Sequence, residues 1–406
     1  MTDAVRSILI FEPESEGHPI EWLQHLVRYA ANEDQRCITY MIVASSVRRI
    51  LIQDPVALAE GHIRVVAMTA REQRLCKHKS LLISAFSRWW TMRRYMKQTG
   101  ASAGYFLGID HLMLPLALGF GIGRRAIGGI LFRPSNHYAA LGMARRRLIE
   151  CIKDLRKDII YRLALRNRHV HSIQTLDPYF PDYAARHYHH GNKVRWLPDP
   201  VHPAVNVNIG ENGLVESIPA NLTVLLLFGH ITERKGALIV LDALRHLRPE
   251  VAKTTGIIFA GRVEETLRER FENGLSALAA ARPEVWVHVE DRRIGSGELY
   301  ALVDRSDLIL APYQRFVGSS GVLLWAARAG KPIVTQEFGL LGRLVRDNHL
   351  GFTADTSDEQ SLCNCIESAL SVDQTGHFDG QTAAKFVAPM TPQRFADDIF
   401  RSLLVA

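Results

Sequence analysis

The sequence has few cysteines and no long apolar run, and both absences narrow its class. Five cysteines, an odd number in 406 residues, argue against a disulfide framework and favour a reducing compartment. The most apolar stretch, Leu112 to Ile122, is well short of the roughly 20 residues that span a bilayer. No segment resembles a signal peptide or a low-complexity tract. We therefore expect a cytoplasmic protein, either soluble or peripheral on the inner face of the membrane.

The charge is moderately basic, with 49 Lys and Arg against 42 Asp and Glu and a net charge of +7. This excess predicts an anionic partner such as a nucleotide, a phosphorylated substrate or a membrane surface. Nucleic acid fits poorly, because no nucleic-acid-binding motif accompanies the charge. The run of histidines from His187 to His190 lacks the spacing of a metal site. A metal site is therefore not expected there, and we expect no cofactor.

The chain alternates short β-rich runs with longer helical patterns, which predicts parallel sheets covered by helices. In the first half the expected strands are 7–11, 36–43, 63–68, 105–108, 129–132 and 169–173, and the expected helices are 19–31, 71–97, 112–118, 144–168 and 178–187. In the second half TVLLLFG, GIIFAG, VWVHVE, DLILAP and KPIVTQ are continuous apolar runs, typical of strands buried on both faces. We predict two doubly wound, Rossmann-like α/β domains facing a central cleft, at 1–200 and 223–390. A linker rich in Pro, Asn and Gly, at 201–222, would join them, and 391–406 would form a final helix.

The motif FGHITERKG runs out of an apolar strand into an amphipathic helix. Gly229 ends the strand, and Gly236 is expected to let the backbone approach a ligand. His230, Arg234 and Lys235 supply donors near the positive end of the helix, as an anion site requires. The alternative is an ordinary loop with solvated cations.

A second anion-ready segment follows the apolar run DLILAP. Four small residues, Gly318, Ser319, Ser320 and Gly321, open a helix there. They are expected to leave backbone N–H groups and two hydroxyls free for phosphate oxygens. A capped helix without a ligand is the alternative, and two such helix starts in one sheet make it the weaker one.

The order FGHITERKG, IIFAGR, GELYALVDRSDLILAPY, GSSGVLLWAARAGKPIV and GLLGRLVRDNHLGF resembles the donor half of the family 4 glycosyltransferases, of group 1 type and GT-B fold. By this resemblance Lys235 grips the donor diphosphate, and its side chain should be exposed in the cleft. Arg262 joins the donor-binding candidates, whereas His230 replaces a family arginine. The two glutamates of a family Glu-x7-Glu motif fall on Val317 and Trp325, and Trp325 should pack inward.

The resemblance implies transfer of a sugar from a nucleoside diphosphate sugar, with UDP or GDP, to an acceptor hydroxyl. It further implies retention of configuration, no metal, and a final helix that crosses back to the first domain. The acceptor would be a carbohydrate or a lipid-linked carbohydrate in polysaccharide or glycolipid assembly. A non-catalytic GT-B scaffold that lost both glutamates is an alternative, and a nucleotide-sugar epimerase is another.

The first half supplies candidates for catalysis and for the acceptor side, all placed after predicted strands. The catalytic candidates are Asp110, His111 and His18, and the acceptor-side candidates are Gly17, Arg133 and His137. An oriented carboxylate or imidazole near the acceptor hydroxyl would serve the chemistry. Asp110 could equally be a helix N-cap, and Arg133 with His137 a salt-bridged loop.

Two segments mix basic and apolar or aromatic residues, Ser87 to Lys97 and Arg145 to Arg168. Interfacial helices combine such residues to bind anionic headgroups. Both segments could equally be solvated helices that cover a sheet with their aromatic residues in the core.

Overall fold

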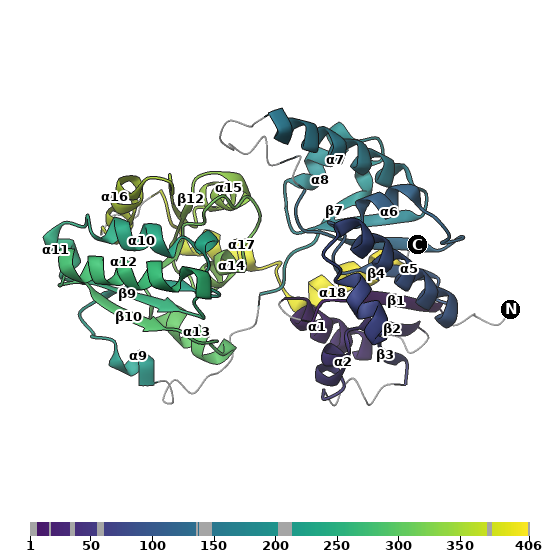
Figure 1. Ribbon diagram of the computed structural model, residues 1–406, viewed down its shortest axis with the longest axis horizontal. Helices are drawn as coiled ribbons and strands as arrows, with labels where there is room; N and C mark the ends of the chain where they lie inside the picture. Colours follow the sequence, from purple (N-terminus) through teal and green to yellow (C-terminus); the bar gives the residue numbers. More distant parts are fainter. Residues whose placement is uncertain are drawn as a thin grey trace. The chain divides into compact units, whose positions relative to one another are not determined.

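The computed structural model describes residues 6–15, 18–32, 37–54, 61–134, 137, 148–201, 213–371 and 376–404. They form two compact units (Figure 1). The first unit holds the described residues up to Pro200 together with the last helix. The second holds those from Val201 to Pro389. Among the described residues, no helix has the length and apolarity needed to cross a membrane.

The first unit is built on a seven-stranded sheet of order β3-β2-β1-β4-β5-β6-β7, in which all neighbours are parallel. The strands are β1 (Arg6–Glu12), β2 (Cys37–Val43), β3 (Ile63–Ala67), β4 (Ala103–Phe106), β5 (Ala126–Leu131), β6 (Val170–Thr175) and β7 (Val194–Trp196). The order reverses between β1 and β4, and open sheets of this kind bind ligands at the carboxyl edge of that point.

Helices cover both faces of this sheet. Along β1 successive side chains point to opposite faces, so Ile8 and Ile10 enter one core while Leu9 and Phe11 enter the other. The first core is closed by α1 (His18–Asn32), α2 (Ser45–Leu51) and α18 (Pro392–Leu404). The second is closed by α4 (Ala70–Cys76), α5 (Leu81–Thr99), α6 (Met113–Leu118), α7 (Leu148–Arg166) and α8 (Phe180–His187).

The expected helix 71–97 is two helices, α4 and α5, and the prediction of one was wrong. A capping box of Thr69 and Glu72 starts α4. Its last carbonyl, that of Cys76, accepts hydrogen bonds from Ser84 Oγ and Arg88 Nε of α5. These side chains supply the hydrogen bonds that the carbonyl group at the end of α4 needs. The chain can therefore leave the helix there, although the helical pattern of apolar residues in the sequence continues.

The last helix, α18, packs on α1 in the first unit. Phe395 lies 5.1 Å from the ring of Trp22, and Phe400 lies 5.1 Å from that of Tyr29. The Tyr29 hydroxyl donates to Asp397 at 2.9 Å. About 190 residues, those of the second unit, separate this helix from the rest of the first unit. The chain therefore leaves the first unit after Pro200 and returns to it at Met390.

The second unit is built on a six-stranded parallel sheet of order β10-β9-β8-β11-β12-β13. Its strands are β8 (Thr223–Phe228), β9 (Thr255–Ala260), β10 (Trp286–Glu290), β11 (Leu308–Ala311), β12 (Ile333–Gln336) and β13 (Gly351–Ala354). Its helices are α9 (Gly213–Ser217), α10 (Ala237–Leu244), α11 (Pro249–Ala252), α12 (Arg268–Ala281), α13 (Ser296–Arg305), α14 (Gly321–Arg328), α15 (Gly339–Asp347), α16 (Glu359–Leu370) and α17 (Gly380–Val387). The central strands are buried on both faces, as their continuous apolar sequence predicts. Two Rossmann-like units make the α/β class of the fold as expected.

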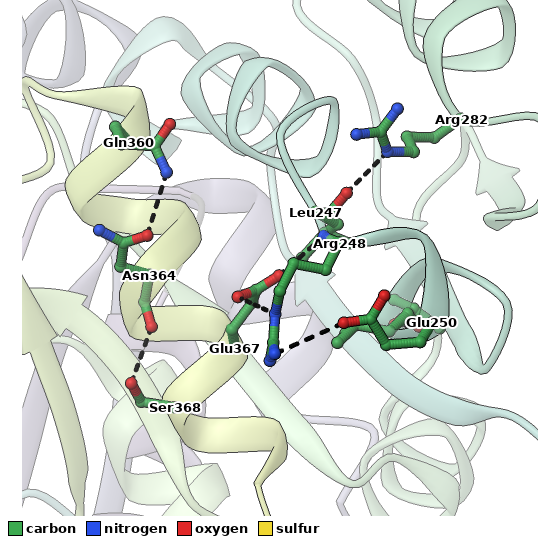
Figure 2. Close-up of polar contacts among 10 residues, drawn as sticks. Leu247, Arg248, Glu250, Arg282, Gln360, Asn364, Glu367 and Ser368 are labelled. Atoms are coloured by element: carbon green, nitrogen blue, oxygen red, sulfur yellow. Dashed lines mark hydrogen bonds and ion pairs between the residues drawn. The ribbon is translucent and has the colours of Figure 1, made fainter.

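A polar cluster fixes the loop after α10 to helix α16 (Figure 2). Glu367 accepts hydrogen bonds from the backbone N–H and the Nε of Arg248, both at 2.8 Å. Arg282 donates to the carbonyl oxygen of Leu247 at 2.7 Å. The loop is therefore held by one side chain from α16 and by one directly after α12, two helices that are distant in the sequence.

Candidate anion-binding site

Lys235 is buried, which corrects the expectation that its side chain would be exposed. Only 9% of the residue is accessible. Its ammonium donates to the carbonyl oxygen of Phe228 at 2.8 Å and to the hydroxyl of Tyr313 at 3.1 Å. Within the described residues it has no carboxylate partner. A buried charge without a counterion is costly, so the site favours binding of an anion.

A chain of hydrogen bonds joins Lys235 to the start of helix α14. The Tyr313 hydroxyl lies 2.7 Å from Ser320 Oγ, and that oxygen also accepts the Val322 N–H at 3.2 Å. Ser320 is the N-cap of α14. The two anion-ready segments of the sequence therefore meet through Tyr313. The Ser320 hydroxyl is engaged within the protein, so the expectation of two free hydroxyls was wrong.

The turn before α14 keeps its backbone donors available. The N–H groups of Gly318, Ser319, Ser320 and Gly321 donate to no group in the described part of the chain. The Ser319 hydroxyl likewise has no partner there. Consecutive N–H groups at the N-terminus of a helix bind phosphate through hydrogen bonds and the helix dipole.

The residues directly before this turn are held in place by hydrogen bonds to neighbouring segments of the second unit. Gln314 donates to the carbonyl oxygen of Thr356 at 2.8 Å, and Gln336 donates to that of Phe316 at 3.0 Å. Leu340 N–H donates to the carbonyl oxygen of Val317 at 2.9 Å. The donors are therefore held in place before any ligand arrives, which lowers the entropic cost of binding.

Two glycines of the first loop allow close contacts between protein segments. A Cβ at Gly236 would lie 2.2 Å from the carbonyl oxygen of Pro312, and the residue has φ 77°. The segment directly after β11 thus occupies the space beside Gly236. This corrects the expectation that Gly236 lets the backbone approach a ligand. Gly229, with φ 96°, would place a Cβ 3.0 Å from Lys235 Nζ. A side chain there would crowd the ammonium.

Three further cations predicted to bind the donor are exposed around the loop: His230, Arg234 and Arg262. The guanidinium of Arg234 lies over the ring of Phe316 at 4.8 Å, which orients it beside the Gly318–Gly321 turn. The N–H of Ile231 donates to the Arg262 carbonyl oxygen at 2.9 Å, so Arg262 lies next to His230. These positions agree with a role in binding an anion, and that role stays a prediction.

The two positions without the family glutamates are half-buried. Trp325 lies 6.4 Å from the ring of Phe228 and 6.4 Å from that of Tyr300. The Val317 backbone lies 2.9 Å from the position of a Cβ at Gly339. Aromatic and aliphatic groups therefore stand where the family places two carboxylates.

In the first unit, Asp110 holds the loop that follows β5. Its two oxygens accept the N–H of Phe132 at 3.0 Å and that of Arg133 at 2.8 Å. Burial is the main cause that raises the pKa of its carboxyl. Asp110 does not cap α6, whose N-cap is Leu112, and neighbouring His111 is exposed. A catalytic role for this pair stays a prediction.

The two described acceptor-side candidates differ in their environment. His137 is buried, with Nε2 at 3.6 Å from an Asp177 oxygen, whereas Arg133 is exposed. His137 thus faces a carboxylate, as the salt-bridged loop predicts for it, whereas Arg133 forms no ion pair within the described residues. A role of either residue on the acceptor side stays a prediction. Gly17 lies outside the described residues, and of His18 only its place at the start of α1 is described.

Residues 223–372 match the family model described as glycosyl transferases group 1. The chain carries a group 1 glycosyltransferase domain. No curated protein matches the chain in sequence. In fold it is similar to HepE from Anabaena, solved with UDP and glucose, at a TM-score of 0.65, 15% identity and coverage of 99% of this chain and 100% of that chain.

Two further structures show the same GT-B fold. Sucrose-phosphate synthase from Thermosynechococcus elongatus matches with a TM-score of 0.69 at 14% identity, over 98% of this chain and 99% of that one. WaaG, a glycosyltransferase involved in lipopolysaccharide biosynthesis, matches with a TM-score of 0.64 at 14% identity, over 97% of this chain and 99% of that one. The GT-B fold of this glycosyltransferase is therefore confirmed.

Two residues of the glycosyltransferase were not singled out from the sequence. Tyr313 joins Lys235 to Ser320, and its place directly after the apolar run DLILAP was the available signal. Glu12 is a buried acid at the carboxyl end of β1, and burial raises its pKa to about 7. Its signal was a charged residue that ends the first apolar strand.

Proposed function

We propose that this glycosyltransferase transfers a sugar from a nucleoside diphosphate sugar to an acceptor hydroxyl. The observation that carries the proposal is the buried ammonium of Lys235, joined through Tyr313 to a helix start with four available N–H groups. A diphosphate supplies the negative charge that this arrangement lacks. These groups would bind the donor and stabilise the leaving group.

In the proposed reaction the bond between the anomeric carbon and the diphosphate oxygen breaks, and the acceptor oxygen takes the place of the diphosphate. Negative charge develops on the diphosphate as it leaves. Lys235, with the N–H groups of residues 318–321, would stabilise it electrostatically. The acceptor hydroxyl loses its proton, and Asp110, His111 and His18 are the candidates to accept it. Retention of configuration and independence of metal are part of the proposal.

The donor base we propose is uracil. Support comes from HepE, which has the same fold and was solved with UDP and glucose. The aromatic group of Trp325, Tyr300 and Phe228 gives the nucleoside flat apolar surfaces in place of carboxylates.

The acceptor we propose is a carbohydrate carried on a lipid, in polysaccharide or glycolipid assembly. The protein would then be peripheral at the cytoplasmic face of an anionic membrane. WaaG, of the same fold, acts in lipopolysaccharide biosynthesis, and the net charge of +7 suits an anionic surface.

Incubation with a panel of UDP- and GDP-sugars, with and without a bacterial lipid extract, tests the proposal. The expected products are free UDP and a glycosylated lipid, with both reduced in Lys235→Met. A nucleotide sugar that is bound but returned intact would instead indicate a scaffold. An intact nucleotide sugar with an altered sugar would indicate an epimerase.

A further inference from the structure

Exposed large hydrophobic side chains are distributed unevenly in the described part of the chain. All of them belong to the first unit, and all except Ile50 lie on the helical layer formed by α4 to α7. Among the described residues, the opposite layer carries only Ile50, on α2. One side of this unit therefore presents apolar groups to its surroundings, and such a patch marks a binding surface.

Helix α7 carries the most regular part of this surface. Leu155, Ile159 and Leu163 are 62%, 50% and 48% exposed. Residues four apart lie on one face of a helix, so the three form a stripe about 12 Å long. The opposite face of α7 is in the core through Tyr161, Ala164 and Leu165. The helix is thus apolar on two faces, and the described residues cover only one of them.

The end of α6 and the loop after it add two more exposed side chains, Leu118 and Phe120. They lie beside the C-terminal end of α7, because Asn167 donates to the carbonyl oxygen of Leu116 at 2.6 Å. A Cβ at the intervening Gly119 would contact the same asparagine side chain. Leu118, Phe120, Leu155, Ile159 and Leu163 are called the α7 face below.

Cations without acidic partners surround the α7 face. Arg156, Arg166 and Arg168 are exposed and form no ion pair within the described residues. Arg162 is also exposed, and it is paired with Asp158 on the preceding turn. This combination of an apolar stripe with flanking arginines matches the composition of interfacial helices on anionic bilayers.

A second exposed apolar group, at the start of α5, fits an anionic surface less well. Leu81 and Leu82 are each 61% exposed. Of the basic residues nearby, however, Lys77 and Arg88 both pair with Glu14. Further along α5, Trp89 and Tyr95 are in the core. Within the described residues Lys79 and Lys97 also form no ion pair, but they lie near opposite ends of α5, whereas Arg156, Arg166 and Arg168 all flank the α7 face.

We propose that the α7 face docks on an anionic phospholipid bilayer. Its apolar side chains enter the interfacial region while Arg156, Arg166 and Arg168 bind lipid phosphates. A second copy of the chain is a poorer occupant, because symmetric packing would bring like arginines together. The inference deepens the proposed function, since it names the surface through which the enzyme would reach a lipid-carried acceptor.

Co-sedimentation of the full chain with phosphatidylcholine vesicles, with and without phosphatidylglycerol, tests the proposal. The wild type should bind the anionic vesicles and lose binding as salt rises. The variant Leu155→Ser/Ile159→Ser/Leu163→Ser should partition at least about tenfold less. Arg156→Gln/Arg166→Gln/Arg168→Gln should lose the preference for phosphatidylglycerol. The matched control, Ile50→Ser on the other layer, should bind as the wild type does.

Three results would overturn the proposal: wild-type protein that stays in the supernatant with anionic vesicles, a triple serine variant that binds normally, or loss of binding in Leu82→Ser instead. A shift from dimer to monomer in the serine variant, without a change in vesicle binding, would assign the face to a second copy. UDP affinity, measured on the same variants, should be unchanged. If the wild type failed to bind UDP, this result would count against the proposed donor site and not against the α7 face.

Discussion

Lys235 in the second unit and Glu12 in the first are ionisable side chains buried near the carboxyl ends of central strands. Lys235 follows β8, and its partners within the described residues, Phe228 and Tyr313, are neutral. Glu12 ends β1 and accepts the Glu14 N–H at 2.8 Å. Buried ionisable groups in such positions are candidates for function, because burial costs stability that an ordinary surface residue would not cost.

Glu12 should make the first unit less stable as pH rises. Its pKa is about 7 in the folded chain, against 4.5 for an unperturbed group. Between these values only the unfolded chain loses the proton, so the free energy of unfolding falls with pH by about 3 kcal/mol in total. Glu12→Gln should match the wild type below pH 4.5 and exceed its stability by that amount above pH 7. Denaturant titrations of both proteins at pH 4.5, 6 and 8 measure this, and parallel stability curves would contradict it.

The ribose should be recognised weakly, because Val317 and Trp325 stand where a pair of carboxylates would otherwise lie. A hydrogen bond to a charged group contributes about 1.5–3 kcal/mol, and no such acceptor is offered here. We expect UDP and 2′-deoxy-UDP to bind with similar affinity in calorimetric titrations. A tenfold or greater loss with the deoxy compound would mean that another residue accepts the ribose hydroxyls.

The sequence predicted the candidate residues of the donor site better than their environment. Lys235 and the Gly318–Gly321 turn are brought together, as two helix starts in one sheet suggested. The burial of Lys235 and the contact of Gly236 with Pro312 were missed. Both depend on β11, which is about 75 residues away along the chain, and local patterns carry no information on such packing.

At the scale of elements, continuous apolar runs predicted the strands of the second unit, because a strand that is buried on both faces needs apolar residues at nearly every position. The division between α4 and α5 could not be predicted in this way. It depends on Ser84 and Arg88, whose side chains bond to the Cys76 carbonyl oxygen only in the folded unit.

The cluster at Glu367 should stabilise the second unit through the loop after α10. Its carboxylate is 15% exposed and accepts two hydrogen bonds from Arg248. Glu367→Ala leaves a backbone N–H without its acceptor, so we expect a loss on the order of 1–2 kcal/mol in the free energy of unfolding. Glu265→Ala is the control, because that side chain is 88% exposed and pairs only with Arg268. Thermal unfolding followed by circular dichroism compares them, and equal effects would refute the role of the cluster.

At the scale of the molecule, each unit has its own sheet and its own core, and the chain passes between them twice. A ligand that binds only the native second unit should raise the unfolding temperature of that unit alone. We expect UDP to move one of two transitions in differential scanning calorimetry. An equal shift of both would mean that the units unfold together.

The donor site is defined by the buried ammonium of Lys235 and the available N–H groups of residues 318–321, and the account depends on their binding a diphosphate. Isothermal titration calorimetry with UDP and UMP tests this directly, on the wild type, on Lys235→Met and on the control Lys253→Met, which alters an exposed lysine. The wild type and the control should bind UDP far more tightly than UMP. Lys235→Met should bind UDP about 10- to 100-fold more weakly while UMP affinity changes little. Wild-type affinity for UDP in Lys235→Met would contradict the account.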